Sequence, residues 1–145
     1  MSRGYACIGL DHPKTHHNIG AVLRAAFAFD AALVVASGTR YRRSPLDTPA
    51  GHRHLPLLTV DDLHAAIPFD CIPVAVDIVE GAVPLAGYVH PERAFYVFGA
   101  EDATLGERTL SWCRDVVYIP TRVSLNLAMA VNVVLYDRAA KRGGA

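Results

Sequence analysis

The feature that most constrains the fold is a set of short apolar segments in which hydrophobic residues follow one another without alternation. The clearest of these segments are 5–10, 32–36, 71–76 and 94–98. A strand with one face in water alternates apolar and polar residues, whereas a strand buried on both faces is apolar throughout. Helix-like segments lie between these runs. The sequence therefore predicts an α/β fold with a mostly parallel sheet flanked by helices.

The remaining elements follow from local patterns. Helices are predicted over 18–30, 107–112 and 126–141, and a further strand over 116–119. Thr59-Val60-Asp61-Asp62 has a capping-box-like pattern and is expected to open a short helix. Residues 37–58 and 77–93 are rich in Pro, Gly and charged residues and are expected to be loops. No repeat or linker interrupts the chain, so residues 1–145 are expected to form a single domain.

Composition narrows the protein class. Hydrophobic residues make up 52% of the chain and charged residues 19%, which excludes an intrinsically disordered protein. No run approaches the roughly 18 apolar residues of a membrane span, and the first residues lack the apolar stretch of a secretory signal. We therefore expect a cytoplasmic protein. Cys7, Cys71 and Cys113 are widely spaced, so reduced and mostly buried thiols are favoured over a disulfide, zinc or nucleophilic role.

The net charge is zero, but the charge is unevenly distributed. Residues 1–56 contain seven Lys and Arg against three Asp, and residues 57–145 contain seven against eleven acidic residues. Four arginines crowd one loop-like segment: Arg40, Arg42, Arg43 and Arg53. A solvated loop is the simplest interpretation, but such a cluster is also what binding of a phosphate backbone requires. We take these arginines as candidate RNA-binding residues.

The last predicted helix is apolar around its whole circumference. From Leu125 to Tyr136 only Asn126 and Asn132 are polar. A helix of this kind must be covered on all sides, and the sheet of so small a domain can cover only one. The other side is expected to pack against a second subunit, which predicts a homodimer.

Polar residues of candidate function occur in three places. The first is a helix in which Gly20, Arg24 and Ala28 stack on one face, preceded by Asn18 as a candidate N-cap. A long cation on a stripe of small residues suits a site that a ligand approaches closely. A surface arginine on an alanine-rich helix is an equally good interpretation of this segment alone.

The second and third places follow strands in the C-terminal third. Gly99 to Gly106 includes Glu101 and follows an apolar strand, and Ser124 and Asn126 stand where the last helix begins. In open α/β sheets, ligands bind at the carboxyl ends of the strands. The chain contains no G-x-G-x-x-G, Walker or G-x-S-x-G motif, which removes the usual dinucleotide, nucleotide-triphosphate and hydrolase interpretations.

Taken in order, Asn18 to Arg24, Gly99 to Gly106 and Ile119 to Asn126 resemble the three motifs of the SPOUT superfamily of RNA methyltransferases, in its TrmH-like branch. The resemblance implies a C-terminal trefoil knot, S-adenosylmethionine held in that knot, S-adenosylhomocysteine as its product, and dimerisation through the knot region. It also implies methyl transfer to a ribose 2′-hydroxyl of RNA.

The resemblance also assigns roles to residues. Arg24 is implied as the catalytic arginine, with Asn18 shaping its site and Glu101 in the catalytic pocket. The implied cofactor-binding residues are Val76, Gly99, Ile119, Ser124 and Asn126. Thr121-Arg122 departs from the Met and small residues often found after the Ile-Pro of this family, so contacts there are open. Because guanidinium stays protonated in proteins, Arg24 is expected to align the nucleophile and stabilise negative charge rather than to act as a base.

No metal is expected in the reaction. His16, His17, His52 and His54 lack a carboxylate at fixed helical spacing, which favours solvated loop residues over metal ligands. The resemblance to the minimal members of this family, which act at the tRNA wobble nucleotide, implies a tRNA substrate with the anticodon wobble nucleotide as the preferred target. The alternatives are an rRNA ribose 2′-O-methyltransferase and a non-catalytic RNA-binding knot protein.

Overall fold

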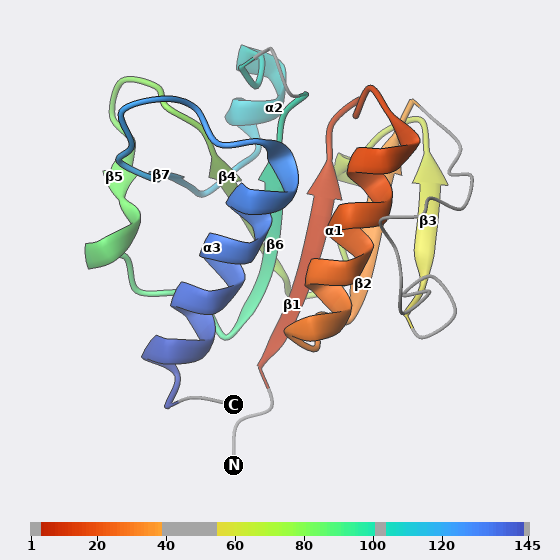
Figure 1. Ribbon diagram of the computed structural model, residues 1–145. Coiled ribbons are helices and arrows are strands. Elements are labelled where there is room, and N and C mark those ends of the chain that lie inside the picture. The colour runs from red at the N-terminus through yellow and green to blue at the C-terminus, as the bar shows by residue number, and fades with distance from the viewer. Residues whose placement is uncertain (1–3, 39–54, 101–103, 144–145) are drawn as a thin grey trace.

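The computed structural model describes residues 4–38, 55–100 and 104–143, and these form one seven-stranded sheet with helices on both faces (Figure 1). The strands are β1 (Tyr5–Leu10), β2 (Leu33–Ser37), β3 (Leu57–Val60), β4 (Ile72–Val76), β5 (Val83–Pro84), β6 (Arg93–Phe98) and β7 (Asp115–Tyr118). The helices are α1 (His16–Ala28), α2 (Glu107–Ser111) and α3 (Leu127–Lys141), with short 3₁₀ turns at η2 (His64–Ala66) and η3 (Leu85–Gly87).

The strand order is β3-β2-β1-β6-β4-β7-β5, and every pairing between described strands is parallel, so the prediction of a parallel α/β sheet is confirmed. Leu10 of β1 pairs with Phe98 of β6, and Val76 of β4 pairs with both Phe98 and Val117 of β7. These strands therefore end in register. The segments that follow them all emerge at one edge of the sheet.

Each face of the sheet has its own hydrophobic core. Helices α1 and α3 pack side by side on one face, where Tyr96, Leu23 and Val131 are fully buried (Figure 1). On the other face, α2 and η2 cover Phe95 and Val97. The central strands are thus buried on both sides, which is why their residues are continuously apolar.

The two long helices begin at side-chain caps. Asn126 caps α3, because its side chain accepts a hydrogen bond from the Met129 backbone N–H at 2.9 Å. The expectation that Asn18 caps the first helix is wrong. The helix begins two residues earlier and Thr15 is its cap, with Thr15 Oγ1 accepting from the Asn18 N–H at 3.1 Å. Both residue types are good caps, and the sequence offers them three positions apart.

Two of the predicted loops contain strands. The capping-box interpretation of Thr59 is wrong, because Thr59 and Val60 end strand β3 and Asp62 accepts the hydrogen bond from the His64 N–H at 3.1 Å. β3 is an edge strand with a half-exposed pattern, so its apolar signal is weak. Within 77–93 the chain adds β5, a two-residue strand at the opposite edge of the sheet.

A buried polar network anchors the C-terminal half of α3. The His90 ring contacts the Tyr96 hydroxyl and the Asp137 carboxylate, both at 2.7 Å. Lys141 also contacts Asp137 at 2.7 Å and donates to the carbonyls of Leu85 and Tyr88. Because these groups are satisfied together, the helix is fixed in position on β6 and the η3 segment.

Arg138 adds a buried cation to the same region. Its side chain donates to the carbonyls of Pro91 and Glu92, both at 2.6 Å, and to the Tyr96 hydroxyl at 3.1 Å. A buried guanidinium is costly unless its N–H groups are used. These bonds therefore join the last turns of α3 to the start of β6.

The three cysteines are free, and Cys7 and Cys71 are buried while Cys113 is half-buried, as predicted. Burial raises the pKa of Cys7 and of Cys113 to about 12, so both thiols remain protonated at neutral pH.

No helix in the described part of the chain is long and apolar enough to cross a membrane.

The state of His90 predicts how stability depends on pH. Burial lowers the pKa of His90 below its usual value of 6.5, although contact with Asp137 acts in the opposite direction. The unfolded chain therefore binds a proton more readily than the folded one, and stability is lost as pH falls below about 6.5. The free energy of unfolding, measured with urea, should be lower at about pH 5.5 than at 7.5.

Replacing the imidazole tests the assignment. His90→Gln lowers stability at both pH values but should show a shallower fall between them, since the titrating group is gone. Tyr88, Asp137, Arg138 and Lys141 surround His90 and are unchanged in this variant. An identical fall in wild type and variant would assign the pH dependence to other groups.

Candidate functional site

The main candidate site is a cavity of about 140 Å³ at the carboxyl ends of β4, β6 and β7. It is lined by Val76, Asp77, Ile78, Phe98, Gly99, Ala100, Ile119, Thr121, Ser124, Leu125, Leu127 and Ala130. An outer hollow of about 420 Å³ shares Ile78, Ile119 and Thr121 with it and extends to Arg122. Together they provide the concave, largely apolar surface that is typical of small-molecule sites.

The register of the sheet creates this cavity. Val76, Phe98 and Val117 are mutually in register, so the residues that follow each strand converge at one place. The first turn of α3 closes the cavity from one face of the sheet, with Leu127 and Ala130 on its wall. Segments far apart in sequence are thereby brought around one ligand-sized space.

Four of the five residues expected to bind the cofactor line this cavity: Val76, Gly99, Ile119 and Ser124. Asn126 does not line it. Its side-chain oxygen caps α3, and the residue lies on the other side of that helix, in a groove between α1 and α3. The helix period explains the separation, because Leu127 and Ala130 face one way and Ala128 and Met129 another.

The groove between α1 and α3 has a volume of about 290 Å³ and contains the expected catalytic arginine. It is lined by Ala21, Arg24, Ala25, Ala28, Asn126, Ala128, Met129 and Asn132. Arg24 thus stands among small residues, as its helical spacing predicts, and its side chain is exposed. The first turn of α3 separates this groove from the main cavity.

The other expected residues are not brought to these cavities by described structure. Asn18 lies in the first turn of α1 and lines neither the main cavity nor the groove. Glu101 and the four arginines Arg40, Arg42, Arg43 and Arg53 lie outside the described residues. Their assigned roles stay predictions.

Sequence reasoning missed Asp77 as a residue of the main cavity. One carboxylate oxygen accepts from the Ile78 N–H at 2.8 Å, and the other accepts from the Leu105 N–H at 2.7 Å. The second bond spans 28 residues and joins the end of β4 to the segment just before α2. The position of Asp77, directly after a buried strand, was the signal available in the sequence.

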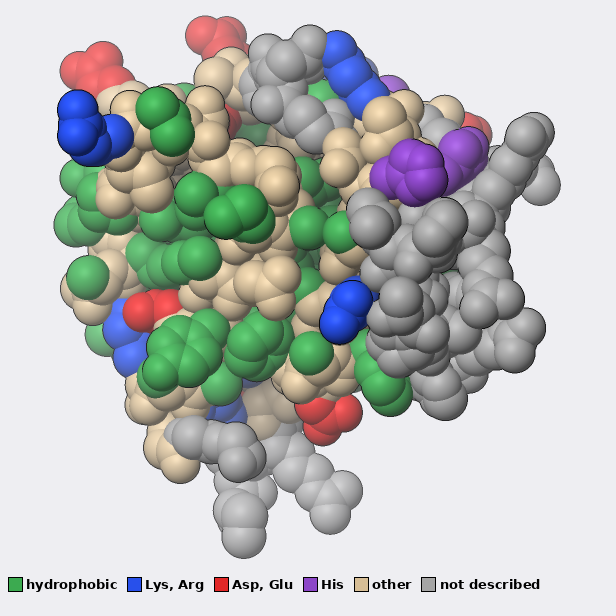
Figure 2. Space-filling view, viewed as in Figure 1, with side chains coloured by type: hydrophobic (Ala, Val, Ile, Leu, Met, Phe, Trp, Pro, Cys, Tyr) green, Lys and Arg blue, Asp and Glu red, His purple; other side chains and the backbone are tan. Residues whose placement is uncertain are grey.

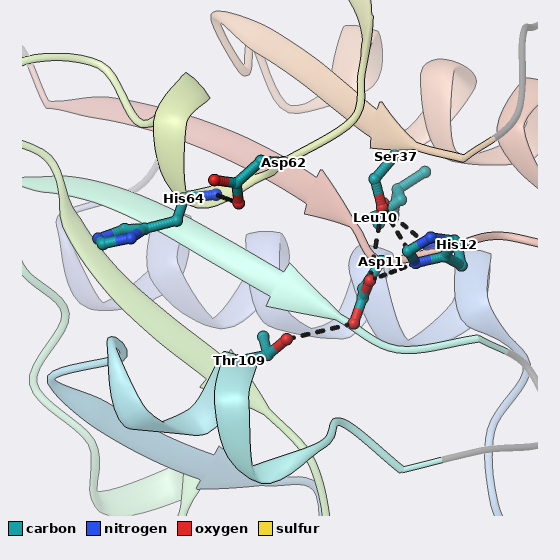
Figure 3. A network of polar contacts seen from close by, with 7 residues as sticks. All are labelled: Leu10, Asp11, His12, Ser37, Asp62, His64 and Thr109. Carbon is teal, nitrogen blue, oxygen red and sulfur yellow. Dashed lines mark hydrogen bonds and ion pairs between the residues drawn. The ribbon is translucent and has the colours of Figure 1, made fainter.

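A separate polar cavity of about 200 Å³ lies at the ends of β1 and β2. Figure 3 shows the network of polar contacts among residues at this place. Asp11 contacts the His12 ring at 2.7 Å, and the buried Ser37 hydroxyl accepts from the His12 N–H at 3.0 Å. Asp11 also accepts from the Thr109 hydroxyl at 3.4 Å, which connects β1 to α2. These bonds hold the residues that follow β1 to the end of β2 and to α2.

His12 has a left-handed backbone in this network, with φ of 53°. Gly38, with φ of 83°, lies against its ring, and a Cβ at Gly38 would come within 2.5 Å of His12 Cδ2. Only glycine accommodates both the backbone conformation and the contact.

The described residues contain no group of three or more His, Cys, Asp or Glu side chains that could hold a metal ion.

The fold and the cavity define a class of protein: a parallel α/β domain that binds a small molecule at the carboxyl edge of its sheet, next to an arginine-bearing groove. The model of the SpoU rRNA Methylase family matches residues 5–136. The chain belongs to this family, and the resemblance to TrmH-like proteins is confirmed at that level.

Individual relatives agree with this assignment. The chain is 30% identical over 151 residues to the 23S rRNA (guanosine-2′-O-)-methyltransferase RlmB of Acinetobacter baylyi, and the match covers 94% of this chain and 60% of that protein. The chain therefore spans less than two thirds of this curated relative.

Two solved structures are similar along the whole chain. The SpoU methyltransferase AviRb from Streptomyces viridochromogenes, solved with AdoMet, matches with a TM-score of 0.84 at 22% identity, covering all of this chain and 61% of that one. A protein from a study of 2′-OH methylation of C/U34 on tRNA matches with a TM-score of 0.81 at 25% identity. The match covers 99% of this chain and 94% of that one.

Proposed function

We propose that the protein transfers a methyl group from S-adenosylmethionine to a ribose 2′-hydroxyl of RNA. The observation that carries this proposal is the cavity at the ends of β4, β6 and β7, in a chain of the SpoU family. Its apolar walls suit an adenine ring, and the hydroxyls of Ser124 and Thr121 supply hydrogen bonds. Asp77 supplies a negative charge opposite a cationic cofactor. The residues present therefore fit this group.

When bound, S-adenosylmethionine supplies an activated methyl group, so the chain's own residues need mainly to align the ribose and exclude water. Arg24 is the residue available for this in the neighbouring groove. A guanidinium is a poor base and a good hydrogen-bond donor, so Arg24 orients the 2′-oxygen and stabilises the negative charge that develops there. Asn18, Glu101 and Asn126 complete the proposed site, with Val76, Gly99, Ile119 and Ser124 around the cofactor.

The proposed RNA is tRNA, with rRNA as the second candidate. The tRNA proposal draws on the relative studied for methylation of C/U34, which matches this chain over nearly its whole length. The rRNA alternative draws on the identity to RlmB. Arg40, Arg42, Arg43 and Arg53 are proposed to contact the RNA backbone, and we place the reaction in the cytoplasm.

We also infer the trefoil knot expected for the family. In support, β7 lies between β4 and β5, both of which precede it in the chain. The segment from 119 to 126 must then return across the sheet edge so that α3 packs beside α1 (Figure 1). The main cavity lies next to this returning segment. It is lined by residues of the segment itself, such as Ile119 and Ser124, and by residues of β4, β6 and α3.

We propose a homodimer because apolar side chains are exposed on the outer face of α1 and α3. Phe27, Met129, Val133 and Tyr136 are 37–65% exposed. Figure 2 shows hydrophobic side chains gathered over these two helices, with few charges among them. Soluble monomers rarely expose contiguous apolar patches of this kind. A two-fold partner on this face would cover them and would lie over the groove that contains Arg24.

The central test is cofactor binding followed by product analysis. Calorimetric titration with S-adenosylmethionine in the presence of a chelator should show binding, and mass spectrometry of nucleosides should detect a 2′-O-methyl product on tRNA. Ala130→Leu, which fills the cavity wall, should abolish binding while the fold remains intact. Methylation of rRNA alone would support the second candidate. Cofactor binding with no product on either RNA would indicate a non-catalytic RNA-binding protein.

Replacing Arg24 tests its catalytic role. Arg24→Ala should lower kcat by about 10²–10³-fold, because one preorganised stabiliser of negative charge is lost. Cofactor affinity should change little, since Arg24 lies outside the cavity. Arg24→Lys keeps the charge but loses the planar fork of donors, so only partial recovery is expected. Turnover of Arg24→Ala near the wild-type rate would remove Arg24 from the mechanism.

The assembly is tested by placing a charge on the exposed helix face. Light scattering at micromolar concentration should show a dimer for wild type and a monomer for Val133→Glu, because an unpaired carboxylate in an apolar interface is costly. Phe69→Glu is the matched control, since Phe69 is 92% exposed in the turn before β4. A monomeric and active wild-type protein would contradict the proposed dimer.

A further inference from the structure

The main cavity has an unusual charge distribution. Of the twelve described residues that line it, Asp77 is the only one with an ionisable side chain, and the others are apolar or neutral. Arg122 lies in the outer hollow, where its side chain is exposed to solvent. Apolar walls weaken screening, so among the described lining residues the Asp77 carboxylate contributes most to the electrostatics of the inner cavity.

The Asp77 carboxylate is held in place from two sides. Its oxygens accept the N–H groups of Ile78 and Leu105, and its own N–H donates to the Val117 carbonyl at 2.9 Å. Leu105 is buried, at 4% exposure, so the hydrogen bond from its N–H to Asp77 comes from a residue fixed in the core. Both carboxylate oxygens are therefore engaged, and the side chain of this cavity-lining residue cannot rotate without breaking at least one of these bonds.

We propose that Asp77 makes the site selective for the cationic cofactor over its product. This inference rests on the proposed function, in which the cavity holds S-adenosylmethionine. In the reaction the S–CH₃ bond breaks, the methyl group joins the ribose oxygen, and the hydroxyl proton leaves. The sulfonium becomes a neutral thioether, so S-adenosylhomocysteine differs from S-adenosylmethionine by the lost methyl group and by one positive charge.

A fixed negative charge distinguishes these two ligands by their charge alone. It attracts S-adenosylmethionine, and that part of the attraction is lost as soon as the methyl group has left. Asp77 thereby favours exchange of spent cofactor for fresh cofactor and limits inhibition by the product. Two opposite charges within one partly buried site predict an effect of at least about tenfold on relative affinity.

The test compares two ligands on two proteins by calorimetry. The measured quantity is the ratio of the Kd for S-adenosylhomocysteine to the Kd for S-adenosylmethionine. Asp77→Asn removes the charge while keeping the shape of the side chain and one acceptor oxygen. The ratio should fall by at least about tenfold, mainly through weaker binding of S-adenosylmethionine. Sinefungin, which has an amine in place of the sulfonium, should lose affinity as S-adenosylmethionine does.

Control variants separate charge from structure. Asp77→Glu retains the charge and should keep a ratio closer to wild type. Asp115→Asn is the same change in β7, at a carboxylate that pairs with Arg114 and the Tyr88 hydroxyl outside the cavity, and should leave the ratio unchanged. Asp77→Thr is a second neutral variant for use if Asp77→Asn does not fold.

The outcomes are distinct. Equal loss of affinity for both ligands in the neutral variants would show that Asp77 only supports the backbone, and it would overturn the inference. An unchanged ratio with unchanged affinities would overturn it as well. If wild type binds S-adenosylmethionine at no concentration, the proposed function itself fails.

Discussion

The structure depends on the parallel register of four adjacent strands. Leu10, Phe98, Val76 and Val117 lie in one row across β1, β6, β4 and β7, so β1, β6 and β4 end together and β7 ends one residue later. A shift of one residue in any pairing would turn its side chains to the opposite face. It would bury the wrong residues and also displace the segments that line the cavity. The same apolar packing therefore fixes both the core and the proposed site.

Helix α3 connects this core to the proposed function. One side packs on the sheet through Val131, Val134 and Leu135, its first turn forms a wall of the cavity, and its outer side exposes Met129 and Tyr136. The network around His90 and Arg138 anchors the far end of the helix. Because a helix is stiff, anchoring one end also limits movement of the cavity wall at the other. The polar network at the far end of α3 thus helps to hold the wall of the proposed cofactor site in position.

Much of this arrangement could be predicted from the sequence, and the exceptions have physical causes. The buried strands of 5–10 and 94–98 were predictable because burial on both faces demands continuous apolar residues. Strand β3 was not predictable, because an edge strand is half exposed and its apolar signal is weak. Thr15 was missed as the cap of α1 because Asn18 offers the same capping chemistry. Asp77 was missed although it directly follows a buried strand, since its bond to Leu105 joins residues 28 positions apart. Local patterns contain no information about such long-range pairing.

The positions of Asp77 and Arg24 indicate which charge each would stabilise in the proposed reaction. Asp77 lies in the cavity and Arg24 in the groove, and the first turn of α3 stands between them. In that reaction, the cofactor's positive charge and the negative charge developing on the ribose would face separate protein charges of opposite sign. Arg24 is exposed in the single chain, where water screens its charge strongly. A partner subunit over the α1–α3 face would exclude that water, so dimerisation would strengthen the electrostatic contribution of Arg24 as well as cover apolar surface.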